Sequence, residues 1–209
     1  MNQDLVLTED LIINGNQPTT IEYGNVTIKN GAKIIVETEA SITIDSISSA
    51  KDIVIHVVGQ NGTNGSDGAN GAMGAPGSPG ADGNLGSDGG SGQNQAPLSL
   101  HLNHIDGNLV VQAGGGNGGN GGNGGNGGEG SKGGNGGNGG HGGAGGNGAN
   151  VEITYHTITG KVSTEHVGGQ GGQGGIGGKG GSGNPAGSNG NSGINGLNGV
   201  PATVTVKQV

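Results

Sequence analysis

Residues 59–94 read GQN GTN GSD GAN GAM GAP GSP GAD GNL GSD GGS GQN, twelve successive triplets that each begin with Gly. The same rule holds over 115–148, where a second Gly usually lies beside the first, and over 169–199 with Asn184 as its one exception. A flexible linker has no reason to keep one phase over a dozen triplets. These three arrays are therefore expected to be ordered, and the alternative is a disordered low-complexity tract.

A period of three predicts polyproline II helices, which have three residues per turn and no internal hydrogen bonds. An edge made only of Gly lets neighbouring backbones approach, and their N–H and C=O groups must then pair between helices. The triplets are broken or stiffened near the middle of each array, at Pro76 and Pro79, at Ser131-Lys132 and at Asn184-Pro185. Turns there would return each array to its start, which gives six helices in one bundle.

The inner edge of such a bundle requires Gly, because a side chain would separate the backbones. Replacing Gly127 or Gly136 by Val should cost several kcal/mol, whereas replacing Asn126 or Asn138 by Ser should cost within ~0.5 kcal/mol. The glycines expected at the inner edge are Gly62, Gly65, Gly68, Gly118, Gly121, Gly124, Gly127, Gly136, Gly172, Gly175, Gly190 and Gly193.

A ladder of Asn residues marks the outer positions of the second array. In one interpretation the amides keep the edge polar and bind a neighbouring backbone. In the other they form a flat face of low charge that binds another copy of the chain, ice or a glycan. The residues of this candidate interaction ladder are Asn117, Asn120, Asn123, Asn126, Asn135, Asn138 and Asn147.

Short apolar runs that alternate with polar residues predict β-strands between 4 and 58. Asn14-Gly15 and Asn30-Gly31 predict tight turns, although the same region also resembles stacked solenoid coils. The segments 98–112 and 151–167 read as β-hairpins, and 200–209 as a last strand. The expected fold class is all-β plus polyproline II, in which short strands and hairpins carry a six-helix glycine-rich bundle. In an alternative, the strands form the coils of a β-solenoid.

The expected division is an amino-terminal β region, 1–58, and a glycine-rich bundle with interleaved hairpins, 59–209. The strand ends at Val58, Gln112 and Val167 recur at about 55 residues, which indicates an internal repeat. The arrays within the second part are bounded at 59–97, 113–150 and 168–199.

The composition excludes several classes of function. The chain has 209 residues, 57 of them Gly, no Phe, Trp, Cys or Arg, and a net charge of −8. Nucleic-acid binding lacks both its electrostatic and its stacking contribution. No run of about 18 apolar residues predicts a membrane span, and no secretory signal is visible at the amino terminus. An extracellular or cell-surface location is expected, with export by another route or with a leader that has been removed.

Enzymatic chemistry has no support in the sequence, and neither a cofactor nor a metal is expected. No GxxxxGK[ST] phosphate loop occurs, and the glycine matches inside the arrays are accidental. His101 and His104 are three apart in a strand pattern, which would place them on opposite faces. His104 and Asp106 could share a face and hold a metal, but no further ligand is implied.

Two resemblances accompany the arrays. GANGAMGAPGSPGADG resembles collagen, with Pro only at Pro76 and Pro79. GGNGGNGGNGG and GGQGGQGGIGGKGG are similar in kind to the six-helix polyproline II bundles of snow flea antifreeze proteins, of the amino-terminal domain of Obg GTPases and of T-even phage tail-tip adhesins. The likeness covers about half the chain and identifies no functional residue. The chain lacks the snow flea Cys residues, the GTPase remainder and the aromatic loop tips of the adhesins.

The expected function is that of a non-enzymatic structural protein that associates with itself as a subunit of a filament. Low surface charge and unpaired sheet edges favour self-association. Ice binding is an alternative, suggested by the snow flea likeness and the flat Asn ladder and supported by the small residues that recur in the first array. An adhesin that binds a receptor or glycan is another alternative. The expected ice-facing rank is Thr63, Ser66, Ala69, Ala72, Ala75, Ser78 and Ala81.

Overall fold

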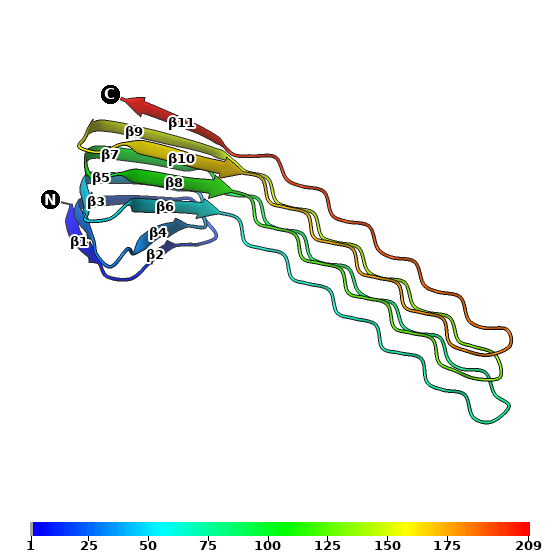
Figure 1. Ribbon diagram of the computed structural model, residues 1–209. Helices are drawn as coiled ribbons and strands as arrows, with labels where there is room; N and C mark the ends of the chain where they lie inside the picture. Colours follow the sequence, from blue (N-terminus) through cyan, green and yellow to red (C-terminus); the bar gives the residue numbers. More distant parts are fainter. Residues whose placement is uncertain (1) are drawn as a thin grey trace.

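Eleven β-strands stack into two parallel sheets at one end of the molecule, and the glycine-rich arrays project from them (Figure 1). The structure is a computed structural model that describes residues 2–209. The strands are β1 (Gln3–Leu7), β2 (Leu11–Ile13), β3 (Thr19–Ile28), β4 (Lys33–Val36), β5 (Ala40–Ser49), β6 (Ile53–Val58), β7 (Leu98–Asp106), β8 (Leu109–Gly114), β9 (Asn150–Ile158), β10 (Val162–Val167) and β11 (Thr203–Gln208). We call the eleven strands the head.

Odd-numbered strands form one sheet, in the order β1-β3-β5-β7-β9-β11, and even-numbered strands form the other, in the order β10-β8-β6-β4-β2. One coil of the chain is therefore an odd strand followed by an even strand. Ile21 pairs with Ile42 in the next coil, and Leu98 pairs with Val151. Each strand thus lies beside its counterpart from the preceding coil, which makes every pairing parallel.

The core lies between the two sheets and is built by alternation. In β6, Ile53, Ile55 and Val57 are fully buried, while the residues between them are half-buried. The same inward positions recur in the strands on either side, so branched apolar side chains stack in rows across the coils. All 24 buried hydrophobic residues lie in the head or in the short turns beside it. Hydrophobic burial therefore stabilises this part of the molecule.

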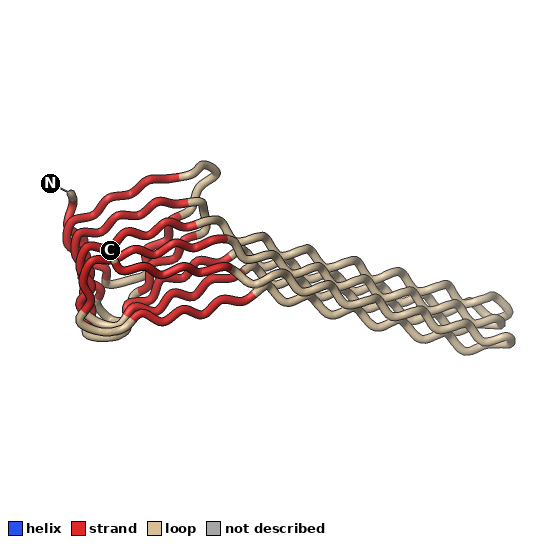
Figure 2. Tube along the Cα trace, turned by 90° about the horizontal axis from the view of Figure 1, so that it is seen from above, coloured by secondary structure: helices blue, strands red, loops and turns tan. Residues whose placement is uncertain are grey.

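The three arrays leave the head at one corner, because they connect β6 to β7, β8 to β9, and β10 to β11. Each runs outward, turns, and runs back beside itself (Figure 2). The six extended legs are named in chain order: A (59–74), B (79–95), C (115–129), D (133–148), E (168–182) and F (187–200). We call these legs and their turns the blade. In the earlier coils, residues 14–18 and 37–39 make the same connection without an array.

Backbone hydrogen bonds hold the blade together at every third residue. Legs A, C and E lie side by side, since Gly62 donates to Asn117 at 2.7 Å and Gly118 donates to Gln170 at 2.8 Å. Legs B, D and F are joined in the same way. Antiparallel bonds connect the two layers, for example from Gly137 to Gly125 at 2.8 Å. This lattice takes the place of an apolar core in the blade.

The expected fold class is wrong. Neither 98–112 nor 151–167 is a hairpin, because the two strands of each segment pair in different sheets. The described residues, 2–209, contain no helix. The arrays are not a polyproline II bundle but extended legs, and they belong to neither sheet. The physical reason for the first error is the repeat itself, which offers each strand an equivalent apolar partner one coil away. The described part of the chain also has no helix that is long and apolar enough to span a membrane.

Candidate interaction surface

The twelve glycines expected at an inner edge all lie where two legs touch. A Cβ added at any of them would collide with a backbone carbonyl oxygen of a neighbouring leg; at Gly127 this is the oxygen of Gly134, and at Gly136 that of Gly178. Real Cβ atoms do not approach backbone so closely. The close contact and the hydrogen-bond lattice have the same cause, because only a backbone without side chains can pair at this spacing. The glycines are a structural feature of the blade.

Each Asn of the candidate ladder joins three legs. The Asn117 Oδ1 accepts the N–H of Gln170 at 2.9 Å, while its own N–H donates to Asn61 Oδ1 at 2.8 Å. The seven side chains are exposed, yet their carbonyl oxygens are all used inside the blade. The corresponding acceptor bonds are made by Asn117, Asn120, Asn123, Asn126, Asn135, Asn138 and Asn147. Each ladder side chain therefore offers a partner its amide NH₂ and the one remaining lone pair of its Oδ1.

The ladder also extends beyond the second array, which the sequence interpretation missed. Asp67, Asp82 and Asp88 accept backbone N–H groups in the same way as their Asn neighbours. On leg F, Asn189, Asn195 and Asn198 accept the N–H groups of glycines in leg E at 2.9 Å each. The shared triplet phase was the signal that could have identified them. These last three bonds occupy N–H groups that would otherwise face outward from leg E. An added strand therefore has fewer free N–H groups to pair with at this leg.

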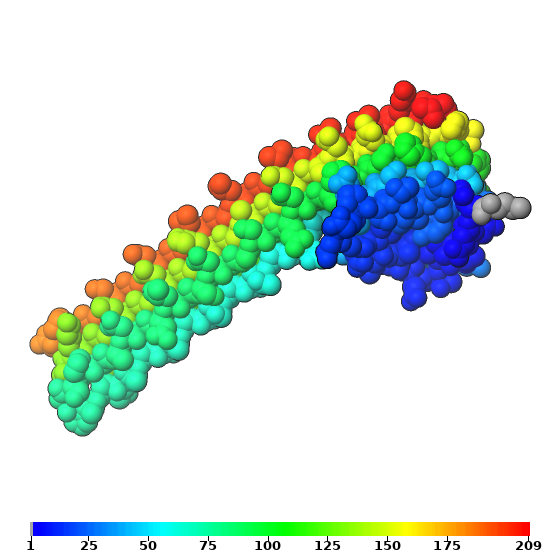
Figure 3. Space-filling model, turned by 180° about the vertical axis from the view of Figure 1, so that it is seen from behind, coloured from blue at the N-terminus to red at the C-terminus, as the bar shows by residue number. Residues whose placement is uncertain are grey.

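Large apolar side chains gather on the side of the molecule formed by legs E and F and the last strands. Seven of the eleven exposed large hydrophobic residues lie there, and we call this surface the apolar edge. On leg F, Ile194, Leu197 and Val200 are 69%, 80% and 66% exposed at triplet spacing. Figure 3 shows the orange side chains of this leg as a row along one long edge of the blade. The other members are Val167, Ile176, Val206 and Val209.

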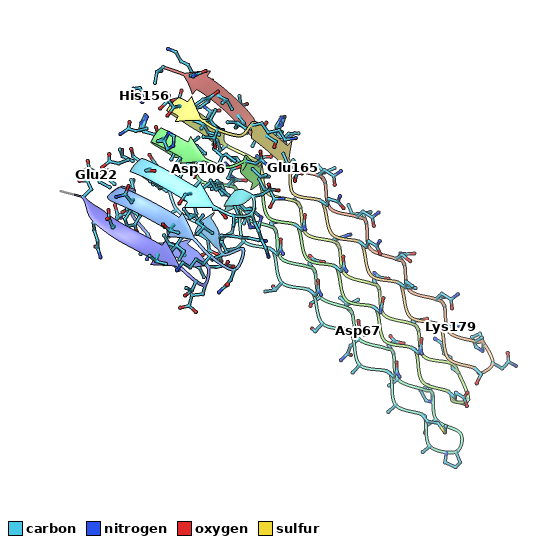
Figure 4. The ribbon with its side chains drawn as sticks, turned by 60° about the vertical axis from the view of Figure 1, so that its left-hand side comes forward. Glu22, Asp67, Asp106, His156, Glu165 and Lys179 are labelled. Atoms are coloured by element: carbon cyan, nitrogen blue, oxygen red, sulfur yellow. The ribbon has the colours of Figure 1, made fainter. Side chains whose placement is uncertain are left out.

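The net charge lies away from the apolar edge. Residues 1–58 carry −5 and the first array carries −3, whereas the acids and lysines from residue 98 onward balance. Figure 4 labels one charged side chain from each side of the blade, Asp67 on leg A and Lys179 on leg E. Since like charges oppose close approach, the acidic side disfavours contact between copies and the apolar edge does not.

Three short turns meet at the far end of the blade. The Ser131 N–H donates to Ser78 at 2.8 Å, and the Asn184 N–H donates to Ser131 at 2.9 Å, which ties the turns together. Beside them lies an open cleft of about 400 Å³, lined by residues that include Met73 and Glu129. Met73 is 72% exposed. This end can present side chains to a partner at a fixed distance from the head.

A second groove, of about 410 Å³, lies where the head meets the blade. His56, Gln112 and Glu165 form one row across β6, β8 and β10, and Gln112 Nε2 donates to Glu165 Oε2 at 2.9 Å. Burial, followed by the nearby Lys33, lowers the pKa of His56 below its ordinary value. The sequence interpretation missed this row, although its spacing of 56 and 53 residues repeats that of the ladder bonds. The row holds hydrogen-bonding groups without a nucleophile beside a base.

The histidines expected on opposite faces of a strand, His101 and His104, are both exposed on the outer face of β7, so that prediction is wrong. The inward positions shift at Asn103, where the pairing is interrupted, and Leu102 and Ile105 both point into the core. His101 Nδ1 lies 2.6 Å from Thr154 Oγ1, and His104 Nδ1 lies 2.6 Å from Thr157 Oγ1.

The metal site considered for His104 and Asp106 has no support in the geometry. Asp106 instead accepts the hydroxyl of Thr159 at 2.9 Å. Across residues 2–209, no group of three or more His, Cys, Asp or Glu side chains is arranged to hold a metal ion.

Similarity to known proteins is confined to solved structures. No protein-family model matches the chain, and no curated protein is significantly similar to it. One solved structure, a nine polyproline type II helical bundle springtail antifreeze protein from Granisotoma rainieri, aligns with 28% identity over 72% of this chain and 96% of that chain. Its TM-score is 0.13, so nothing about the fold or function of this chain follows from the match.

Proposed function

We propose that this chain is a non-enzymatic structural protein whose copies associate through the apolar edge. The observation that carries the proposal is the gathering of seven of the eleven exposed large hydrophobic residues on one side of the molecule. Contiguous exposed apolar surface marks interaction sites in soluble proteins. In a blade whose outer positions are otherwise mostly Asn, Gln, Ser and Gly, such a row has no role in the hydrogen-bond lattice.

A second copy of the chain is the partner that fits this surface. Ile194, Leu197 and Val200 recur at equal spacing along a straight leg, so the same row from another molecule can lie antiparallel against it. Such an isologous contact uses one surface twice and closes as a pair. An open filament requires a second, unlike contact, and the exposed Val6 and Ile12 at the opposite end of the head are the apolar groups available for it.

Sedimentation velocity of the purified protein, up to about 100 μM, tests association. We expect species larger than the monomer whose population increases with concentration and persists at high salt, because apolar contacts are not screened. Negative-stain microscopy of the same samples separates closed pairs from filaments. A monomer throughout this range would overturn the proposal.

The matched variants keep the fold and change the surface. Replacing Ile194, Leu197 and Val200 together by Asn introduces a residue that the blade already carries at equivalent outer positions, and should abolish association. Leu85→Asn is the control, because Leu85 is 68% exposed on leg B, away from the apolar edge. Association of the triple variant equal to that of the control would remove the apolar edge from the proposal.

Presentation of the blade tip to a receptor or glycan is a second candidate function. The specific observation that favours it is the cleft beside the three linked turns, with the exposed Met73 at its rim. A glycan array or cell-binding assay, repeated with Met73→Ser, tests this function. Binding that is unaffected by the substitution, or no binding, would remove it.

Ice binding is not proposed. The Asn oxygens of the ladder are engaged by backbone N–H groups. The expected ice-facing rank does not lie on one straight leg, because Ala75 and Ser78 lie at a turn and Ala81 runs back beside Ala72. Measurement of thermal hysteresis remains the direct test of that alternative.

A further inference from the structure

The sequence contains fifteen Asn-Gly pairs, and such pairs are chemically labile. The backbone nitrogen of Gly attacks the Asn Cγ, so that a new N–Cγ bond forms, the Cγ–Nδ2 bond breaks, and ammonia leaves with the displaced proton. Water then opens the resulting succinimide to Asp or isoaspartate. The reaction consumes water alone and requires a free glycine nitrogen, a mobile side chain and local backbone freedom.

Thirteen of the pairs lie in the blade, where both reacting groups are held. The N–H of every glycine in these pairs donates to a backbone carbonyl of another leg, as Gly118 does to Gln170 at 2.8 Å. The Oδ1 of every asparagine accepts a backbone N–H, as Asn117 does from Gln170 at 2.9 Å. The asparagines are Asn61, Asn64, Asn70, Asn117, Asn120, Asn123, Asn126, Asn135, Asn138, Asn147, Asn189, Asn195 and Asn198.

The remaining two pairs, Asn14-Gly15 and Asn30-Gly31, lie in turns of the first coils. Both asparagines are exposed. Within residues 2–209, neither glycine nitrogen donates a hydrogen bond, and neither asparagine side chain makes one. Asn30 and Gly31 have φ of 58° and 76°, which places them at the corner of a turn closed by the bond from Ala32 to Lys29 at 3.0 Å.

We propose that Asn14 and Asn30 are the two deamidation sites of the folded protein, and that the blade suppresses the same reaction at its thirteen Asn-Gly pairs. Attack on Cγ in the blade requires the Gly N–H bond and the Oδ1 bond to break together. Both bonds go to the same neighbouring leg, as Gly118 and Asn117 both bind Gln170, so the contact between two legs must open locally. Reaction at both turns replaces two neutral amides with carboxylates in residues 1–58, a region that already carries −5.

Peptide mapping by mass spectrometry tests the inference on the intact chain. The folded protein is incubated at mildly alkaline pH, and a second sample is incubated in urea. In the folded sample we expect deamidation at Asn14 and Asn30, and a rate at least about tenfold slower at the blade asparagines. In urea all fifteen pairs should react at similar rates, because the protection belongs to the fold.

Two variants make the test specific. Asn14→Gln with Asn30→Gln should remove nearly all deamidation from the folded sample, while the urea sample retains thirteen reactive pairs. Lys179→Pro removes the N–H that binds Asn126 Oδ1 and keeps the carbonyl that accepts from Gly127, so it should raise the rate at Asn126 above that at Asn123. Equal rates at turn and blade pairs in the folded protein would overturn the proposal.

Discussion

Asn123 makes three bonds that fix its leg on both sides. Its N–H donates to Asp67 Oδ1 at 2.7 Å, its Oδ1 accepts from Ile176 at 2.9 Å, and its carbonyl accepts from Gly68 at 2.7 Å. Asn123→Ala should therefore lower the free energy of unfolding by about 1 kcal/mol, the typical net contribution of one hydrogen bond. Asn123→Asp keeps the acceptor and should cost less. Denaturant titration of both variants checks the difference, and an equal loss in the two would contradict it.

The same bonds change an expectation drawn from the sequence alone. Asn126→Ser and Asn138→Ser were expected to cost no more than other surface substitutions. Because the Oδ1 atoms accept from Lys179 and Asn191 at 2.8 Å each, we now expect about 1 kcal/mol for each substitution. The exposure of a side chain does not measure its contribution to stability when its polar atom binds a backbone N–H group.

Gly136 and Gly77 differ in what surrounds them. A Cβ at Gly136 would meet the carbonyl of Gly178, whereas the space around Gly77 is open and its φ is 82°. Gly136→Ala should cost several kcal/mol, since the backbone of leg D or leg E must move. Gly77→Asn should cost less than about 1 kcal/mol, because Asn tolerates the left-handed region. Thermal denaturation compares them, and similar melting temperatures would refute the close contact.

His56 gives the head a pH-dependent stability. Burial, and then Lys33, lowers its pKa in the folded state below 6.5, the value for an unperturbed His. The unfolded chain then binds the proton more readily, so this contribution is complete above about pH 6.5 and is lost as the pH falls through the folded-state pKa. His56→Gln should show a smaller loss of stability between about pH 7 and 5 than the unsubstituted protein. A steeper loss of stability in the variant would mean that His56 opposes acid unfolding, contrary to this prediction.

At the scale of elements, the sequence located the segments but not their partners. The turns of the arrays lie at the breaks in the triplets, near Pro76, Ser131 and Asn184. The strand pairing was wrong because the alternating residues of 98–112 and 151–167 are equally compatible with a hairpin and with a corner between two sheets. The apolar edge was also missed, since the triplet phase marks Leu197 as an outer residue without indicating which legs border the blade.

The head should fold without the blade, because a coil closes equally well without an array. Ile21 pairs with Ile42 across the short connection at 37–39, whereas Ile42 pairs with Leu100 across a whole array. A variant in which each array is replaced by a copy of residues 14–18 should retain both sheets and the buried core. Circular dichroism and a cooperative thermal transition would demonstrate this. An unfolded variant would mean that the blade stabilises the head.

The whole molecule combines a part with an apolar core and a part without one. Average proteins unfold with a heat-capacity increase of 12–15 cal/mol/K per residue, or about 2.5–3.1 kcal/mol/K for a chain of this length. Unfolding of the blade exposes mainly peptide groups, and polar exposure lowers the heat capacity. The buried hydrophobic residues lie in the head and its adjoining turns. We therefore expect an increase below about 2 kcal/mol/K.

Calorimetry over a range of pH measures this increase from the slope of the unfolding enthalpy against the transition temperature. The variant whose arrays are replaced by copies of residues 14–18 is the matched control. Its heat-capacity increase per residue should be that of an ordinary protein, while that of the full chain should be lower. A low heat-capacity change also flattens the stability curve, so the full chain should lose little stability on cooling. A full-chain value at the average for its length would mean that the blade buries apolar surface beyond the row-stacked core of the head.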